Sequence, residues 1–267
     1  MTAFPPVSPA DAAAANAYDP WAPYYDAIHA TRPPHVAFYT GLIGPGVRRL
    51  LDMGCGTGSV TRAMAAAMRA QGPAQVAGFD LSERMIAAAR AADPGIDWRV
   101  GDLRDPPFDG PFDLVTCTFH TMQVLQTDAD MARCLAAVRG LLAADGRFAF
   151  DIYNPNRAWL ARVPSGRVAH RFAGPDGRAL RIIEDLSYDP GTEVLTGWWH
   201  LQDDATGAAL DLPPLVHKVR QYAPDRLAAL IAAAGLRVQQ RWGDLDLTPW
   251  TDRARRQVLV LGRADPA

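Results

Sequence analysis

Hydrophobic and polar positions follow two different periods along the first part of the chain. Short apolar runs end at glycine or aspartate, and the segments between them carry apolar residues at helical spacing. Strands that alternate with helices in this way predict a parallel sheet covered by helices on both faces. The predicted strands are residues 47–54, 74–80, 96–102, 112–119 and 147–152, and the predicted helices are 21–30, 34–43, 60–72, 82–93 and 128–146.

The pattern changes between residues 154 and 222. Residues 178–189 and 192–204 are β-rich runs separated by the turn sequence DPGT, and residues 215–222 alternate apolar with polar positions. This segment is predicted to be an antiparallel insert. A helix at 224–235 and strands at 236–242 and 255–263 then resume the first pattern. We therefore expect an unstructured tail (1–16), a core domain (17–153 and 223–267) and a β-rich insert on the substrate side (154–222).

Composition and charge narrow the class of protein. The chain has 267 residues, 49% apolar and 21% charged, which is typical of a globular protein. Its net charge is −2, and of its 27 basic residues only Lys218 is a lysine, so no nucleic-acid partner is expected. Three cysteines without CxxC spacing, no signal-peptide pattern and no long apolar run predict a cytoplasmic protein that does not contact a membrane.

The strongest chemical motif is the sequence LLDMGCGTGS at residues 50–59. Gly54, Gly56 and Gly58 follow a predicted strand and open a helix, where the backbone can approach a ligand closely and free N–H groups are available. The dinucleotide fingerprint GxGxxG requires a final glycine, but this position is Ser59.

Acidic residues mark the ends of successive strands. Asp52 stands within the glycine motif, Asp80 ends the next strand, and Asp102 ends the third. The carboxyl ends of parallel strands meet at one rim of the sheet, which is where ligands bind in open α/β folds. A carboxylate at the position of Asp80 can accept hydrogen bonds from both hydroxyls of a ribose, in nicotinamide and adenosyl cofactors alike.

These motifs, LLDMGCGTGS, GFDLS and GDLRD, resemble in order the first three motifs of the class I S-adenosylmethionine-dependent methyltransferases of the small-molecule type. The resemblance implies an α/β fold with a Rossmann-like, seven-stranded, mostly parallel sheet and an insert after the fifth strand. It implies S-adenosyl-L-methionine as cofactor and the glycine loop, Asp80 and Asp102 as its contacts. An aromatic side chain at Tyr25 would cap the methionine end, with Tyr18 or Tyr24 as alternatives. The cofactor-binding residues expected from the resemblance are Tyr25, Asp52, Gly54, Cys55, Gly56, Gly58, Asp80, Leu81, Met85, Asp102, Leu103 and Thr118.

The segment after the fourth strand is expected to face the methyl group and the acceptor. His120 is the candidate general base there, because a neutral imidazole can take a proton near physiological pH. The alternative is a histidine that only holds its loop in place. No metal is expected, since no acid follows the fourth strand. Aromatic side chains of the insert, among them Trp198 or Trp199, are expected to line the acceptor pocket.

The leading hypothesis is methyl transfer from S-adenosylmethionine to an oxygen or nitrogen of a small-molecule metabolite. An alternative is a sensor or inactive partner that binds the cofactor without catalysis. A nicotinamide-dependent oxidoreductase is disfavoured by Ser59 and by Pro214, which leaves Lys218 outside a Tyr-x-x-x-Lys pair. The expected partner is a small-molecule methyl acceptor, and the expected oligomeric state is a monomer or a homodimer.

Overall fold

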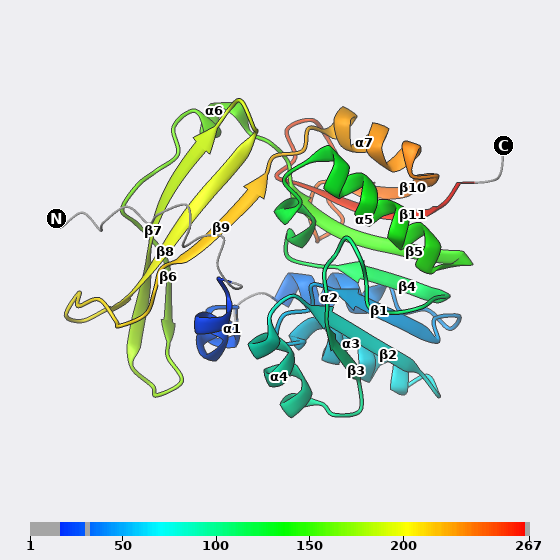
Figure 1. Ribbon diagram of the computed structural model, residues 1–267, viewed down its shortest axis with the longest axis horizontal. Helices are drawn as coiled ribbons and strands as arrows, with labels where there is room; N and C mark the ends of the chain where they lie inside the picture. The colour runs from blue at the N-terminus through cyan, green and yellow to red at the C-terminus, as the bar shows by residue number, and fades with distance from the viewer. Residues whose placement is uncertain (1–16, 30–32, 265–267) are drawn as a thin grey trace.

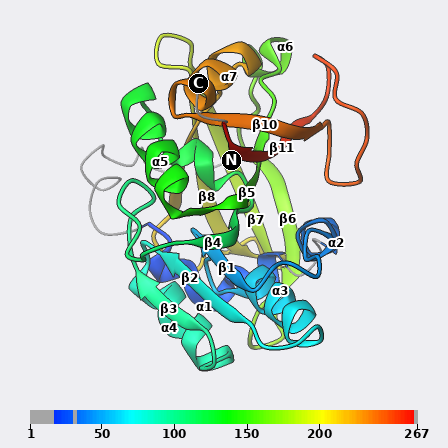
Figure 2. The ribbon, with the colours of Figure 1, turned by 90° about the vertical axis from the view of Figure 1, so that its right-hand side faces the viewer.

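A seven-stranded sheet forms the centre of the computed structural model, which describes residues 17–29 and 33–264. The predicted tail at 1–16 lies outside these residues. The strand order is β10-β11-β5-β4-β1-β2-β3, and Figure 2 shows β10 and β11 at one margin and β3 at the other. β11 runs in the opposite direction to the other six strands of this sheet, so the predicted mostly parallel sheet is confirmed. The strands are β1 (Arg49–Met53), β2 (Gln75–Asp80), β3 (Asp97–Val100), β4 (Phe112–Cys117), β5 (Leu142–Tyr153), β10 (Leu236–Trp242) and β11 (Arg256–Arg263).

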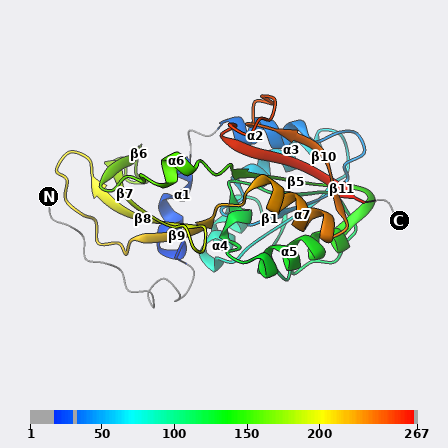
Figure 3. The same cartoon turned by 90° about the horizontal axis from the view of Figure 1, so that it is seen from above.

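Helices cover both faces of this sheet, as predicted (Figure 3). Three of them bury their apolar stripes on one face, and α3 does so through Val60, Met64 and Met68. Two helices pack on the other face through residues such as Leu135 and Ile231. The first group is α2 (Pro33–Gly41), α3 (Ser59–Arg69) and α4 (Glu83–Ala92), and the second is α5 (Asp128–Leu141) and α7 (Pro224–Ala233).

A separate antiparallel sheet has the order β6-β7-β8-β9 and stands beside the carboxyl ends of the core strands (Figure 1). Its strands are β6 (Arg167–Ala173), β7 (Ala179–Asp189), β8 (Val194–Asp203) and β9 (Leu215–Arg220), and β9 is an edge strand. One face packs against Trp21 of η1 (Asp19–Trp21) and Ile28 of α1 (Ala22–His29). The strands lie within the predicted insert, whose exact boundaries remain a prediction.

One predicted element was wrong in its extent. The alanine-rich segment 128–146 was expected to be a single helix, but α5 ends at Leu141 and β5 begins at Leu142. Leu142 pairs with Phe112 of β4, and this pairing in the sheet outweighs the helical propensity of the alanines that follow. β5 therefore begins five residues before the predicted strand at 147–152 and ends at Tyr153.

Within the described residues, 17–29 and 33–264, no helix is both long and apolar enough to cross a membrane. The longest of these helices, α5, has 14 residues.

Candidate active site

A cavity of about 730 Å³ lies at the carboxyl ends of β1 to β4 and extends to the edge strand β9. Its volume falls in the range of small-molecule and cofactor sites. Most of the residues predicted from the sequence line this cavity: Tyr25, Gly54, Gly56, Asp80, Leu81, Met85, Asp102, Leu103 and His120. Four others do not line it, namely Asp52, Cys55, Gly58 and Thr118. The residues from separate strands are thus brought together as the sheet topology predicts.

The glycine loop leaves β1 in a left-handed backbone conformation. Gly54, Gly56 and Gly58 have φ angles of 65°, 55° and 76°, which favour glycine. A Cβ atom at Gly56 would lie 3.2 Å from the ring of Tyr25, and one at Gly58 would clash with the ring of Trp98. Gly54 and Gly56 therefore open the cavity wall, whereas Gly58 allows α3 to begin close to β3.

Asp80 stands at the rim between this loop and α4. Its Oδ2 atom accepts a hydrogen bond from the amide of Gly56 at 2.9 Å, and its Oδ1 atom accepts one from the amide of Ser82 at 2.9 Å. Burial raises the pKa of Asp80, and these amide hydrogen bonds oppose that rise. Each oxygen keeps a further lone pair, so the carboxylate can also accept from two ligand hydroxyls.

Asp52 lies beneath the loop and outside the cavity. Its carboxylate is buried and accepts hydrogen bonds from the hydroxyls of Thr61 at 2.5 Å and Thr116 at 2.7 Å. Burial raises the pKa of Asp52 to about 6. These contacts join β1, α3 and β4, so Asp52 supports the glycine loop from below.

Apolar side chains form one end of the cavity. Leu81 is 59% exposed although it is a large apolar residue, while Met85 and Leu103 are buried next to the cavity. Asp102 also lines the cavity and accepts hydrogen bonds from Arg104, whose guanidinium lowers the pKa of Asp102. Arg104 was missed in the sequence, because an arginine in the loop after β3 carries no specific signal. This end therefore combines apolar side chains with the carboxylate of Asp102.

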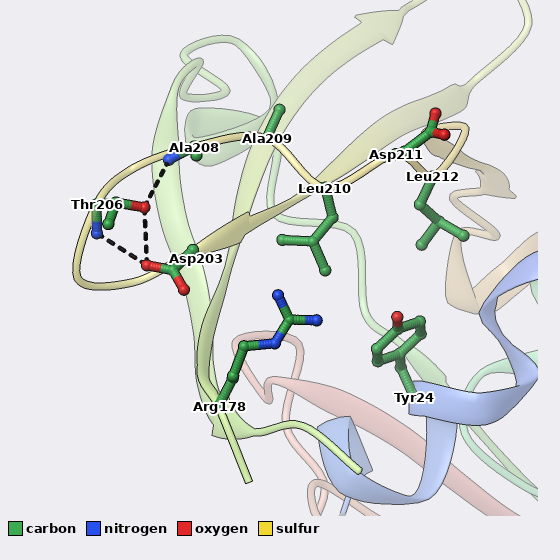
Figure 4. Close-up of a pocket in the computed structure, with 9 residues that line it drawn as sticks. All are labelled: Tyr24, Arg178, Asp203, Thr206, Ala208, Ala209, Leu210, Asp211 and Leu212. Atoms are coloured by element: carbon green, nitrogen blue, oxygen red, sulfur yellow. Dashed lines mark hydrogen bonds between the residues drawn. The ribbon is translucent and has the colours of Figure 1, made fainter. Parts of the chain in front are cut away.

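Residues 18–29, which include η1 and α1, form a covering segment over the glycine loop. Tyr25 and Tyr18 both line the cavity, with ring centroids 6.2 Å apart. Tyr24 points elsewhere and borders a second depression of about 530 Å³ beside Arg178 and Leu210 (Figure 4). The structure thus favours Tyr25 or Tyr18 over Tyr24 at the methionine end of the cavity.

Two hydrogen bonds fasten this covering segment to the core. Thr57 Oγ1 donates to Asp26 Oδ1, and Ser82 Oγ donates to Asp19 Oδ1. Ser82 also caps α4, since its hydroxyl accepts a hydrogen bond from the amide of Met85. The covering segment is therefore held to both the glycine loop and the first turn of α4.

His120 lies on the other side of the cavity in a strained turn. Both Phe119 and His120 have positive φ angles, 57° and 62°, which are uncommon for residues with a side chain. The imidazole Nδ1 lies 3.1 Å from Asp151 Oδ2, and Nε2 lies 2.8 Å from Arg256 Nη1. The ring also stacks on Tyr153 at 3.6 Å between centroids. Both ring nitrogens thus have partners behind the cavity wall.

Asp151 is the centre of this buried group. It accepts hydrogen bonds from Tyr39 at 2.7 Å, from Arg256 at 2.9 Å and from the amide of Phe119 at 3.2 Å. Burial alone would raise its pKa, but His120, His35 and Arg256 hold the pKa of Asp151 well below its ordinary value. A permanently charged carboxylate therefore fixes the turn that carries His120.

The ligand atoms of His35, His120 and Asp151 lie within 4.8 Å of one another, close enough to share a metal ion. However, Arg256 Nη1 lies 2.9 Å from the Asp151 oxygen that a metal would bind. A guanidinium at this distance repels a second cation. We therefore interpret the cluster as an ion-pair network, and the expectation of no metal stays a prediction.

The four-stranded sheet supplies its edge strand to the cavity, through Val216, His217, Lys218 and Val219. The expectation that Trp198 or Trp199 faces the acceptor was wrong, since neither lines the cavity. Trp199 packs against Trp21, and its indole donates a hydrogen bond to Glu184. The alternation in the sequence identified β9 as a strand, but it could not indicate that this strand borders the site.

The cavity has the shape and polarity that S-adenosylmethionine requires. Gly54 and Gly56 leave room that side chains would fill, Asp80 offers free lone pairs at the rim, and Leu81 exposes an apolar surface inside the cavity. The residues present therefore fit this cofactor.

Comparisons with known proteins agree with this fit. Residues 50–146 match the family model described as a methyltransferase domain. The chain is 30% identical over 190 residues to the dTDP-4-amino-2,3,4,6-tetradeoxy-D-glucose N,N-dimethyltransferase of Saccharopolyspora spinosa. The aligned part covers 68% of this chain and 72% of the relative.

Two solved structures have the same architecture. The CcbJ methyltransferase of Streptomyces caelestis is 22% identical, with a TM-score of 0.73 over 94% of this chain and 98% of that one. The SAM-bound amino pentose methyltransferase CalS10 of Micromonospora echinaspora is 25% identical, with a TM-score of 0.59 over 99% of this chain and 100% of that one. Together with the motifs and the cavity, these similarities show that the chain belongs to the class I S-adenosylmethionine-dependent methyltransferases.

Proposed function

We propose that this methyltransferase acts on an amine nitrogen of a small molecule of the amino-sugar type. The observation that carries the choice of nitrogen is the geometry around His120, whose two ring nitrogens face Asp151 and Arg256. A hydroxyl acceptor needs a base that removes its proton during transfer, whereas a neutral amine already carries the attacking lone pair. The relatives named for amino-sugar substrates support the same choice.

In this proposal the chain acts mainly by positioning. When bound, S-adenosylmethionine supplies an electrophilic methyl carbon on a sulfonium sulfur. Gly54 and Gly56 bind its methionine part, Asp80 accepts from its ribose hydroxyls, and Leu81, Met85, Asp102 and Leu103 surround its adenine. Tyr25 closes the methionine end, and Cys55, Gly58, Thr118 and Asp52 support the loops from outside the cavity. In-line alignment of this kind can supply most of the acceleration.

His120 forms part of the wall on the acceptor side. Its predicted role as general base remains untested, and Arg256 at Nε2 favours the alternative in which His120 holds the loop. Because a donor already occupies Nε2, that nitrogen can take a proton only if Arg256 moves away.

The proposal is tested first by calorimetric titration with S-adenosylhomocysteine, run beside NAD and NADP. We expect micromolar binding of the adenosyl ligand only, weakened at least about tenfold by Asp80→Ala, which removes charge-assisted hydrogen bonds. Asp97→Ala is the matched control, because this carboxylate is exposed on β3 and pairs with Arg99. Binding of nicotinamides in place of the adenosyl ligand would reject the cofactor assignment.

Turnover is then measured with pairs of sugars that differ only by an amine or a hydroxyl at one carbon. Methylation of the amine member alone supports the choice of nitrogen. Equal or faster methylation of the hydroxyl member contradicts it, and no turnover with either would support a sensor or inactive partner.

A further inference from the structure

β9 is an edge strand, and its residues 216–219 line the cavity. On one side β9 pairs with β8, and the amide of Gln221 donates to the carbonyl of Glu193 at 2.8 Å just beyond that ladder. The carbonyl of Arg220 instead accepts from Gln123 Nε2 at 2.7 Å and so points away from β8. Since backbone groups alternate along an edge strand, the N–H and C=O of Lys218 point to the same side as those of Arg220.

Lys218 is the cation of this wall that has no acidic partner within the part of the chain that the structure describes. Its neighbour on the same strand face, Arg220, pairs with Asp128 at 3.0 Å and with Glu193 at 3.2 Å. The residue Lys218 is half-buried and lines the cavity. Its charge is therefore available to a ligand.

The carboxylates that line the cavity already have partners. Asp80 accepts from the amides of Gly56 and Ser82, while Asp102 and Asp130 both pair with Arg104, at 2.6 Å and 3.2 Å. None of them forms an ion pair with Lys218 among the described residues. An anionic group of a ligand could therefore pair with Lys218 without displacing a carboxylate of the protein.

His217 does not add a charge at this place. It lies on the opposite face of β9, packed over Gly197 and near Trp199, and burial lowers the pKa of its imidazole. The neutral ring leaves Lys218 as the charged group of the segment 216–219.

We propose that Lys218 and the free edge of β9 form a subsite that binds a phosphate-type anion carried by the methyl acceptor. The ammonium would serve as a point charge, and the outward N–H of Lys218 as a second donor to the same group. This inference rests on the proposed function, because it assigns one end of the acceptor to a wall of the same cavity.

The test uses the full chain saturated with S-adenosylhomocysteine and measures binding of thymidine diphosphate and of thymidine. In the wild type the diphosphate is expected to bind at least tenfold more tightly than the nucleoside. Lys218→Met should reduce this ratio to near one, and Lys218→Arg should keep most of it. Arg162→Met is the matched control, because Arg162 is exposed and lies outside the cavity.

A ratio that stays unchanged in Lys218→Met, or the absence of any preference for the diphosphate in the wild type, overturns the inference. These outcomes are distinct from failure of the proposed function, which would appear as binding of nicotinamides in place of S-adenosylhomocysteine, or as equal or faster methylation of the hydroxyl sugars. Retained cofactor binding in Lys218→Met shows that the variant is folded.

Discussion

The Nδ1 atom of His120 lies 3.1 Å from Oδ2 of Asp151, directly behind the cavity wall. Arg256 contacts both residues, and Tyr39 binds the second oxygen of the carboxylate. The strained turn at Phe119 and His120 is thus tied to β5 and β11 by a single buried carboxylate. This arrangement leads to the first two predictions.

Asp151→Asn should lower the free energy of unfolding by about 3–5 kcal/mol, because it leaves the buried cation of Arg256 without its closest carboxylate. The measurement is denaturant unfolding followed by circular dichroism. Asp97→Asn breaks the exposed pair with Arg99 and should cost less than about 1 kcal/mol. Equal effects of the two substitutions would show that the buried network does not stabilise the fold.

His120→Gln should lower kcat less than about tenfold and leave the shape of the pH–rate profile unchanged, because a positioned base typically contributes about 100-fold or more. The rate is measured with an amine acceptor between pH 6 and 9. If the substitution instead removes an ionisation from the acidic limb, together with a loss above 100-fold, His120 acts as the general base.

Gly58→Ala should destabilise the protein by more than about 1–2 kcal/mol, because alanine disfavours the left-handed conformation and its Cβ would clash with Trp98. Thermal unfolding measures the change. Gly44→Ala is the control, since a Cβ at Gly44 meets nothing within 4 Å and its φ angle is not left-handed. Similar stability of the two variants would contradict the close packing of α3 on β3.

Asp52 should give the protein a distinctive dependence of stability on pH. Its pKa is about 6 in the folded protein, above the value of about 3.9 in an unfolded chain. Between these pH values the folded state binds more protons than the unfolded state, so this group lowers the free energy of unfolding as pH rises. Between pH 4 and pH 7, the free energy of unfolding of Asp52→Asn should therefore rise by about 2–3 kcal/mol relative to that of the wild type.

The check is a series of urea titrations at fixed pH values for wild type, Asp52→Asn and Asp97→Asn. The difference between Asp97→Asn and wild type should stay flat over this range. A flat difference for Asp52→Asn as well would mean that its carboxylate is not protonated in the folded protein near pH 5.

Asp26→Ala should speed the release of S-adenosylhomocysteine, because it removes the hydrogen bond from Thr57 that fastens the covering segment to the glycine loop. We expect a rise of about threefold to tenfold in the dissociation rate, corresponding to the loss of one hydrogen bond. Stopped-flow fluorescence of the tryptophans measures the rate. Asp97→Ala should leave it unchanged, and an unaltered rate in Asp26→Ala would show that this segment does not gate release.

The local part of the site could be predicted from the sequence, whereas its long-range part could not. Gly54 and Gly56 follow β1, and Asp80 is the last residue of β2 in the same βαβ unit, so their meeting is fixed by topology. Tyr25 and Tyr24 are adjacent on α1, and only the packing of that helix decides which of them enters the cavity. Arg256 reaches His120 across more than a hundred residues of sequence, and β9 enters the site through the placement of a second sheet.

One hydrophobic cluster links the cofactor end of the cavity to its acceptor end. It joins Trp21 and Ile28 to four residues of the smaller sheet, β9 included, namely Leu180, Ile182, Leu201 and Leu215. The segment over the glycine loop and the sheet that carries Lys218 share these buried contacts. A hinge motion that uncovers the cofactor must therefore also shift a wall of the acceptor end. An acceptor bound against β9 would resist that motion. The packing of α1 against the four-stranded sheet would therefore determine the order in which the two products leave.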